Sequence, residues 1–291
     1  MAELEKLIFY NEYGNGDIFE SREFVEELYA FFNPAECYYA HGKDPHIIKD
    51  MEFLTSIPFD HGKMDSMKPF IIDGDTLYIN TWIGRDGKYV LPGIGCTVEK
   101  LHEMYNEILM MLDMKYELKK PPTGYIPMIK FLKYDIQNIC EFVTHHQELM
   151  VLISNGPVQS NQAYNFDFTP VVDRLCDEFK DVSFIVTSQI SLEKPNLYFT
   201  WDIIKSDKGC DLNEIGYLST FCNIVVGRSS GPQVFAQHHD NYVDSNKTNI
   251  SFTYECIASH FVLTKMPMKL VWSGATKEDD VFIVIKTIIE R

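Results

Sequence analysis

Residues 222–236, CNIVVGRSSGPQVFA, combine the signals of a strand, a turn and a helix. The apolar run up to Val226 predicts a strand, the glycines and serines that follow predict a turn, and Pro232 is typical of the first turn of a helix. Segment 7–32 has the same order of an apolar run, a glycine loop and a helical apolar face. A chain that alternates strands, loops and helices in this way indicates a parallel sheet covered by helices.

The same order recurs along the chain, with apolar runs typical of strands that are covered on both faces. Further strands are predicted over 36–42, 149–154, 182–188, 196–202 and 269–274, with two more within 68–82, and helices over 99–114, 135–147, 169–179, 211–222 and 278–290. We therefore expect an α/β protein with two Rossmann-like domains that face a central cleft. The stretch KKPPTGYIP, residues 119–127, is loop-like. We place the domains at 1–146 and 147–291, with the last helix packing back on the first domain.

The composition limits the classes of partner. The chain has 291 residues, with 26 basic and 42 acidic side chains and a formal net charge of −16, which argues against nucleic acid or an anionic membrane as the main partner. Seven cysteines are spread without a C-x-x-C pair, so neither a disulfide scaffold nor a structural zinc site is indicated. The start, MAELEKLIFY, lacks the basic region of a signal peptide, and no apolar run of about 18 residues occurs. We expect a cytoplasmic protein without stable membrane insertion.

The loop at 227–231 has a G-x-S-x-G spelling that allows several chemical interpretations. A hydrolase would use Ser229 as the nucleophile of a strand-to-helix elbow, with Asp240 or Asp244 and then His260 completing the order Ser, Asp, His. In a plain structural turn, the glycines would serve the backbone geometry alone.

The same loop also has the features of a phosphate site, which is the interpretation that we favour. Its small residues allow close approach, the hydroxyl groups of Ser229 and Ser230 donate, and Gly231 opens a helix whose first N–H groups lack partners. Arg228 adds a cation. The loop after the strand at 149–154 offers similar donors: Ser154, Asn155, Gly156, Ser160 and Gln162. We therefore expect the two loops to surround one diphosphate.

The first domain has candidate residues where its strands end. Asp17, in GNGDIFESR, stands at a strand-to-helix junction, where an acidic side chain either caps the helix or faces the cleft as a general base. Arg22 is either a surface ion-pair partner or a functional cation. Asn80 and Trp82, at the end of a predicted strand, either line an acceptor pocket or belong to the core.

Trp201 and Asp202 follow a predicted strand of the second domain and are expected near the same cleft. Residues 73–75, Asp-Gly-Asp, either hold a divalent cation or form a tight turn, and the D-G pair between two strands favours the turn. The histidine pairs at 145–146 and 238–239 lack the spacing of a zinc site and are interpreted as surface residues. We predict no metal site.

With Gly16-Asp17 at the first strand-to-helix junction and VVGRSSGPQVFA at 225–236, the chain resembles a GT-B glycosyltransferase. In layout it is most similar to the heptosyltransferase-like group, which uses ADP-heptose. In that group, a G-D pair supplies a catalytic aspartate, and a G-x-S-G-P-like loop binds the nucleotide diphosphate. The resemblance implies that domain 1–146 binds the acceptor and domain 147–291 binds the nucleotide sugar.

The resemblance also implies a reaction, the inverting and metal-independent transfer of a hexosyl or pentosyl group to a hydroxyl of a glycan acceptor. Asp17 would take the acceptor proton, while the diphosphate would leave toward Ser229, Ser230 and Gly231. The nucleotide-diphosphate sugar is a co-substrate, with UDP ranked slightly ahead of GDP and ADP, and no other cofactor is expected. A serine hydrolase using Ser229 and a non-catalytic sugar-nucleotide-binding protein are the alternatives.

Overall fold

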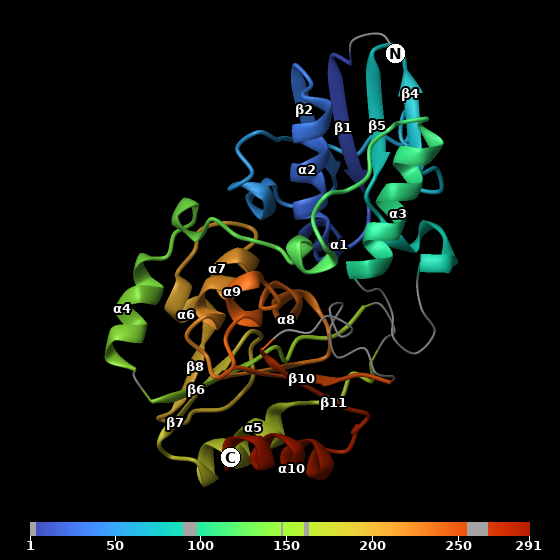
Figure 1. Cartoon of the computed structure of the whole chain (residues 1–291). Coiled ribbons are helices and arrows are strands. Elements are labelled where there is room, and N and C mark those ends of the chain that lie inside the picture. Colours follow the sequence, from blue (N-terminus) through green and yellow to red (C-terminus); the bar gives the residue numbers. More distant parts are fainter. Residues whose placement is uncertain (1–3, 90–97, 147, 160–162, 255–266) are drawn as a thin grey trace. The chain divides into compact units, whose positions relative to one another are not determined.

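The computed structural model describes the chain except for residues 1–3, 90–97, 147, 160–162 and 255–266 (Figure 1). The chain divides into two compact units, Met1–Met128 and Ile129–Arg291. Each unit is built on its own mostly or wholly parallel sheet with helices packed against it. The prediction of an α/β protein with two Rossmann-like domains is confirmed.

The first unit has a five-stranded sheet of order β3-β2-β1-β5-β4. Its strands are β1 (Lys6–Asn11), β2 (Glu36–His41), β3 (Thr55–Ile57), β4 (Phe70–Asp73) and β5 (Thr76–Asn80), and only β4 is antiparallel to its neighbour. Its helices are α1 (Asn15–Glu20), α2 (Arg22–Phe32) and α3 (Val98–Met111), with short 3-10 turns η1 (Pro45–Ile48), η2 (Ile83–Arg85), η3 (Gly87–Tyr89) and η4 (Pro122–Tyr125). The chain proceeds from β1 to one side of the sheet and then returns to β5 on the other side, so a topological switch point lies between β1 and β5.

The second unit has a six-stranded sheet of order β11-β10-β9-β6-β7-β8, in which all neighbouring strands are parallel. Its strands are β6 (Leu149–Ile153), β7 (Val182–Val186), β8 (Leu197–Phe199), β9 (Ile224–Gly227), β10 (Thr248–Phe252) and β11 (Lys269–Ser273). Its helices are α4 (Gln137–His145), α5 (Thr169–Glu178), α6 (Thr200–Ile204), α7 (Leu212–Ser219), α8 (Gly231–Phe235), α9 (His239–Tyr242) and α10 (Glu278–Ile289), with the 3-10 turn η5 (Phe131–Lys133). This is the strand order of a Rossmann fold, with its switch point between β6 and β9.

Both faces of the second sheet are covered, as the apolar runs predict. Along β6, Val151 and Ile153 pack with α5 and α10, whereas Met150 and Leu152 pack on the opposite face with α4, α6 and α7. Figure 1 shows α5 and α10 on one side of this sheet and α6 and α7 on the other. Successive side chains of a strand point to opposite faces, so a strand covered on both faces is mostly apolar, as β6 is.

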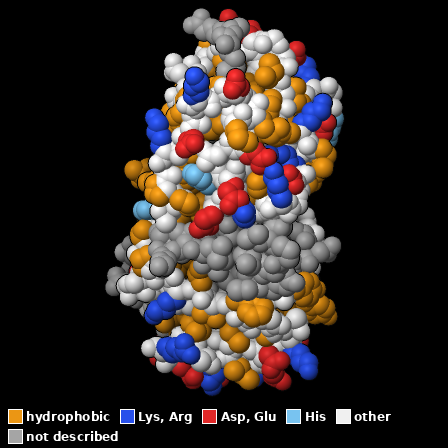
Figure 2. All heavy atoms as spheres, turned by 45° about the vertical axis from the view of Figure 1, so that its right-hand side comes forward, with side chains coloured by type: hydrophobic (Ala, Val, Ile, Leu, Met, Phe, Trp, Pro, Cys, Tyr) orange, Lys and Arg blue, Asp and Glu red, His pale blue; other side chains and the backbone are white. Residues whose placement is uncertain are grey.

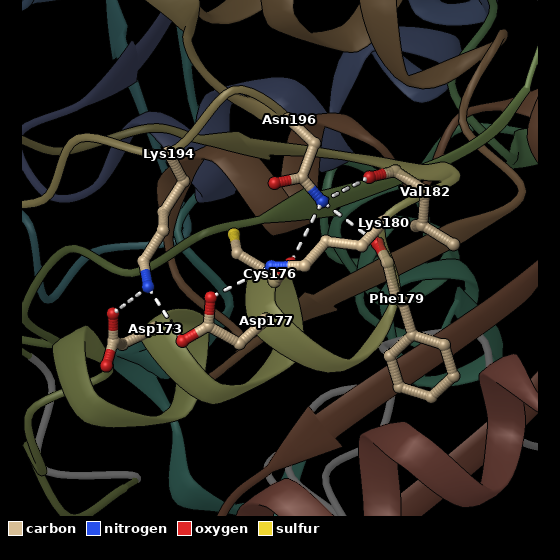
Figure 3. Close-up of polar contacts among 8 residues, drawn as sticks. All are labelled: Asp173, Cys176, Asp177, Phe179, Lys180, Val182, Lys194 and Asn196. Atoms are coloured by element: carbon tan, nitrogen blue, oxygen red, sulfur yellow. Dashed lines mark hydrogen bonds and ion pairs between the residues drawn. The ribbon is translucent and has the colours of Figure 1, made fainter.

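The amino end of β8 is held by polar contacts to α5 and to the start of β7 (Figure 3), in addition to the burial of Leu197 in the core that it shares with α5. The Asn196 side-chain amide donates to the carbonyl oxygens of Phe179 and Val182 at 2.9 and 3.0 Å. Lys194 forms ion pairs with Asp173 and Asp177 of α5 at 2.7 and 2.8 Å. These contacts hold a three-residue strand at the edge of the sheet.

The boundary between the units differs from the predicted one. The α4 helix, assigned to the first domain by the sequence, belongs to the second unit, because Ile139 is fully buried in the core under β6. The predicted loop at 119–127 belongs to the first unit, because Glu27 of α2 accepts hydrogen bonds from the Lys119 amide and the Tyr125 hydroxyl at 2.8 and 2.5 Å. The boundary at 128/129 therefore replaces the one at 146/147.

The last helix, α10, packs on α5 of the second unit. In α10, Val281, Phe282 and Ile285 are buried in the same core as Val171 and Leu175 of α5. An amphipathic helix packs where an apolar surface is available, and α5 offers that surface within the second unit.

Two strand assignments also change. No strand was predicted over 248–252, yet β10 occupies these residues, because Asn249 and Ser251 are buried and bonded to a side chain of α8. The predicted strand at 196–202 ends at Phe199, and α6 begins at Thr200. The strand β10 was missed because its polar residues break the apolar pattern of a buried strand. The helix α6 was missed because its residues have a composition typical of a strand.

Candidate functional site

The loops that follow β6 and β9 lie side by side at the switch point of the second sheet. The Ser154 amide donates to the Val226 carbonyl at 2.7 Å, and the hydroxyl groups of Ser154 and Ser230 are 3.4 Å apart. In open parallel sheets, ligands bind in the crevice at the carboxyl ends of the strands, where the strand order reverses. The two predicted phosphate loops are thus brought together at the expected position.

Arg228 has a different place from the predicted one. Its side chain is 1% exposed, and its guanidinium donates to the carbonyl oxygens of Phe166, Asn155 and Gly156 at 2.7, 2.8 and 2.8 Å. The guanidinium also lies over the rings of Phe166 and Phe168, each with a centroid 4.9 Å away. Because these donors are used inside the protein, Arg228 joins the two loops instead of presenting its charge to a ligand.

The backbone of the β9–α8 loop is held by Gln233, a residue that the sequence did not single out. Its side chain is fully buried, accepts from the Ser229 amide at 2.6 Å, and donates to Asn249 Oδ1 at 2.6 Å and to the Ile250 carbonyl at 2.9 Å. Gly227 makes room for it, since a Cβ on Gly227 would lie 2.6 Å from Gln233 Oε1. A polar residue on the buried face of α8 is the only signal in the sequence that indicates this role.

Ser229 adopts a left-handed backbone conformation, with φ of 55°, which non-glycine residues adopt mainly in turns and at functional loops. Its side chain is 2% exposed. A nucleophile must reach a substrate, and this hydroxyl group is covered, so we do not propose the hydrolase. Of the other predicted members, Asp240 is exposed on α9 and His260 lies outside the described residues.

The groups left to face a ligand at this loop are the hydroxyl group of Ser230 and the amides of Ser230 and Gly231. Ser230 is half-buried and precedes α8, and among the described residues no group is found to accept from these two amides. The α8 helix has only five residues, so its dipole contributes less than the predicted helix N-terminus would. The loop amides and hydroxyl group, rather than a helix dipole, make this an anion-binding candidate.

The loop after β6 uses its predicted donors to build its own structure. The Asn155 side chain donates to the Ser188 carbonyl at 2.9 Å and accepts from the amides of Thr187 and Ser188 at 3.0 and 2.8 Å. A Cβ on Gly156 would lie 2.9 Å from Ser188 Oγ, so glycine is needed for close packing there. The other two predicted residues of this loop, Ser160 and Gln162, lie outside the described residues.

Asp17 is the third residue of α1 and is half-buried. Its carboxylate accepts from the Gly14 amide at 3.1 Å, so the capping interpretation holds in part. Burial raises the pKa of Asp17 to about 6, against the lowering effect of the Gly14 amide and of Lys43. A carboxylate that releases its proton near pH 6 suits a general base at neutral pH. Gly16 precedes it within the same helix.

Arg22 and Asn80 are buried structural residues rather than surface or pocket groups. Arg22 is 2% exposed, pairs with Asp50 at 2.5 Å and donates to the Ile47 carbonyl at 3.1 Å, which ties α2 to η1. The Asn80 side chain is 1% exposed and donates to the carbonyl oxygens of Ser66 and Lys68 at 2.7 and 3.0 Å. The predicted acceptor pocket therefore does not include the Asn80 amide itself.

The predicted tryptophans each lie against another aromatic ring. Trp82 stacks on Tyr13 with ring centroids 3.7 Å apart, and Trp201 stacks on Phe199 at 4.6 Å. The pair of Tyr13 and Trp82 lies where β1 and β5 end, at the switch point of the first sheet. Trp201 and the exposed Asp202 belong to α6, beyond the carboxyl end of β8.

The Asp-Gly-Asp sequence forms the tight turn between β4 and β5, with Gly74 at a φ of 61°. Within the described part of the chain, no group of three or more His, Cys, Asp or Glu side chains is arranged to hold a metal ion. His238 is not a surface residue, since it is 1% exposed and its Nε2 lies 3.1 Å from the Gly216 carbonyl.

Comparison with known proteins shows similarity in fold but no close relative in sequence. No protein-family model matches the chain, and no curated protein is similar to it in sequence. Among solved structures, a glycosyl transferase family 9 protein from Veillonella parvula DSM 2008 has 12% identity and a TM-score of 0.50, covering 98% of this chain and 90% of its own. The ADP-heptose lps heptosyltransferase II of E. coli has 10% identity and a TM-score of 0.50, with coverage of 97% and 98%.

The E. coli heptosyltransferase WaaC, solved with ADP, has 6% identity and a TM-score of 0.53, covering 98% of this chain and 99% of its own. At such identities the similarity concerns the fold. The chain therefore has the fold of the GT-B glycosyltransferases, as the resemblance of its two motifs implied.

The surface carries charges of both signs. Figure 2 shows Lys and Arg side chains interspersed with Asp and Glu side chains on the face that it displays. Among the described helices, none is both long enough and apolar enough to cross a bilayer.

Proposed function

We propose that the protein is a glycosyltransferase that transfers a sugar from a nucleotide-diphosphate sugar to a hydroxyl of a glycan acceptor. The observation that supports this most is the meeting of Ser154 and Ser230 at the switch point of a Rossmann sheet. The solved structures of the same fold are named as glycosyltransferases, two of them with ADP-heptose or ADP in their names.

The diphosphate of the donor binds at the β9–α8 loop. The amides of Ser230 and Gly231 and the hydroxyl group of Ser230 donate to the phosphate oxygens and stabilise the charge that develops as the diphosphate leaves. Arg228 and Gln233 act as positioning residues, because they hold the two loops and the strained Ser229 in place. No metal takes part in this proposal.

Asp17 is the general base. It removes the proton of the acceptor hydroxyl while that oxygen attacks the anomeric carbon from the side opposite the diphosphate, so the configuration is inverted. The raised pKa of Asp17 makes it a stronger base than an exposed aspartate and leaves it mostly ionised at pH 7. The proton goes to Asp17 and the bonding electrons of the broken bond go to the diphosphate.

The first experiment asks which nucleotide binds. UDP, GDP and ADP are compared by thermal shift, since a ligand that binds the native state raises the melting temperature by mass action. We expect one nucleotide diphosphate to stabilise the protein, with UDP as the first candidate. Ser230→Ala should weaken that binding roughly tenfold, because one charge-assisted hydrogen bond is lost. Failure of all three nucleotides would contradict the donor class.

The second experiment tests the base. Asp17→Asn should lower the rate of sugar transfer by about 10²-fold or more, as expected for loss of a general base, while the Kd for the nucleotide stays the same. The control is Asp113→Asn, which removes an exposed carboxylate of the same unit at a residue with a φ of 54°, a conformation that asparagine tolerates. Transfer that persists in Asp17→Asn would reject this residue as the base, and nucleotide binding without transfer to any acceptor would favour a non-catalytic binding protein.

A further inference from the structure

The first unit has an open hollow of about 590 Å³ beside the end of β1. Its lining includes Glu12, Tyr13, His61, Lys63, Ser66 and Lys68. None of these residues was predicted as a site residue. The volume falls within the range of about 300–1,000 Å³ that small-molecule sites occupy.

The floor of this hollow, the turn at residues 65–68, is held from beneath by two buried side chains. The Tyr10 hydroxyl lies 3.0 and 2.8 Å from the carbonyl oxygens of Asp65 and Lys68, and Asn80 donates to those of Ser66 and Lys68. Tyr10 and Asn80 are 0% and 1% exposed. Two buried polar side chains that bond a surface turn fix its shape before any ligand arrives, which lowers the ordering cost of binding.

One wall is aromatic. The Tyr13 ring is covered on one side by Trp82 and remains 38% exposed. The Trp82 ring packs directly against Gly84. Any larger residue at position 84 would displace the ring, because a Cβ there would lie 2.6 Å from it. A rigid, partly exposed tyrosine offers the apolar, polarisable surface on which the C–H groups of a sugar ring pack.

Another wall carries the Glu12 carboxylate. Glu12 accepts through one oxygen from the Ser66 hydroxyl and lies 3.5 Å from His61 Nδ1 through the other. A carboxylate has about four lone-pair sites, so these contacts leave acceptor capacity for ligand hydroxyl groups. The charges around the hollow balance, with Glu12 and Asp65 against Lys63 and Lys68, which suits an uncharged ligand rich in hydroxyl groups.

The hollow is close to the proposed base. Tyr13 directly precedes Gly14, whose amide donates to the Asp17 carboxylate at 3.1 Å. Glu12 and Tyr13 also directly follow β1, at the switch point of the first sheet.

We propose that this hollow binds a neutral sugar ring of the acceptor, packed on Tyr13 and hydrogen-bonded to the Glu12 carboxylate. That the bound sugar belongs to the acceptor rests on the proposed function. The binding of a neutral sugar can be tested without any transfer reaction. Glu12 and Tyr13 are then the residues that select the acceptor.

The test is saturation-transfer NMR on the full chain with methyl β-glucoside, methyl β-galactoside and methyl α-mannoside, and with methyl β-glucuronide as the anionic probe. We expect saturation of at least one neutral glycoside and weaker saturation of the glucuronide. Tyr13→Ala should weaken the binding at least tenfold, and Glu12→Gln severalfold, whereas Tyr13→Phe keeps the ring and should keep most of the affinity. Tyr254→Ala, at a tyrosine of the second unit that is 56% exposed, is the matched control.

The melting temperature of each variant identifies any change that only disturbs folding, and Tyr13→Phe then decides whether the ring is needed. If no neutral glycoside binds, if the glucuronide binds best, or if Tyr13→Ala binds like the wild type, the inference is wrong. If neutral glycosides bind in a way that depends on Tyr13 but no sugar is transferred, the proposed function is wrong and the binding site stands. If the protein transfers sugar and Tyr13→Ala has the same KM for the acceptor as the wild type, the proposed acceptor site is wrong and the proposed function stands.

Discussion

At the scale of single residues, several side chains that were predicted to bind a ligand instead hold segments of the protein backbone in place. Arg228 was expected to face a phosphate, and instead its guanidinium bonds carbonyl oxygens of the neighbouring loop. Arg22 and Asn80 likewise bond backbone carbonyls from buried positions. Side chains with several donors serve to join segments when carbonyl oxygens surround them, and a sequence does not tell which acceptors will be near.

Gln233→Ala should lower the free energy of unfolding by about 2–4 kcal/mol, because the Ser229 amide and the Asn249 side chain lose a buried partner. Nucleotide binding should fall as well, since the β9–α8 loop loses the contact that holds its left-handed residue. Urea denaturation measures the stability. Gln189→Ala, at an exposed glutamine, is the control and should change the stability by less than about 0.5 kcal/mol.

Asp17 gives the reaction its expected pH dependence. Its pKa is raised to about 6, so kcat/KM should fall as the pH decreases through about 6, as the base becomes protonated. The same shift favours the protonated form in the folded state, so this contribution to stability is present below about pH 4 and is lost as the pH rises through about 6. A rate profile that stays flat between pH 5 and 7 would contradict the assignment.

At the scale of elements, buried polar residues fix the positions of helices and loops that the apolar pattern alone does not determine. Glu27 of α2 fixes the segment before the unit boundary, and Lys247 donates to the carbonyl oxygens of Ser219, Thr220 and Cys222 at the end of α7, at 2.9, 2.7 and 2.7 Å. A cation at the carboxyl end of a helix is stabilised by the unpaired carbonyl groups there.

His238, beside α9, should make the stability fall in mild acid. Burial lowers the pKa of His238 to about 4, so the unfolded chain takes up its proton near pH 6.5 while the folded chain does not. The free energy of unfolding should therefore decrease between pH 6.5 and 4, by roughly 3 kcal/mol in total. His238→Gln should remove this part of the pH dependence in urea titrations, whereas His145→Gln, at an exposed histidine, should leave it.

At the scale of the whole molecule, the boundary at 128/129 predicts which fragment folds. A fragment of residues 129–291 retains α4, whose Ile139 is buried with Leu152 and Ile204, and should unfold cooperatively. A fragment of 147–291 exposes that face of the sheet and should be less stable by several kcal/mol or aggregate. Circular dichroism with denaturant compares the two, and equal stability of both fragments would restore the boundary at 146/147.

Much of the fold followed from local patterns. Strands that are apolar throughout, such as β6, and helices with one apolar face, such as α5, were predicted within a few residues of their bounds. The strand β10 was not, since its polar Asn249 and Ser251 are buried inside the sheet, where Gln233 bonds them. Local pattern fails where the partner of a polar group is distant in the sequence.

Two features of the candidate site could be predicted from the sequence: two loops with glycine, serine and amide groups follow strands, and an acidic residue lies in the first turn of the first helix. These features are local, because turn geometry and helix starts depend on neighbouring residues. The three-dimensional contacts were needed to show that Arg228 faces inward, that Gln233 holds Ser229, and that buried side chains hold the floor of the hollow at Glu12. Arg228 bonds residues 62 to 73 positions away, and Tyr10 bonds the floor of the hollow 55 and 58 positions away. Gln233 reaches Asn249 of β10, 16 positions away, and no local pattern encodes any of these contacts.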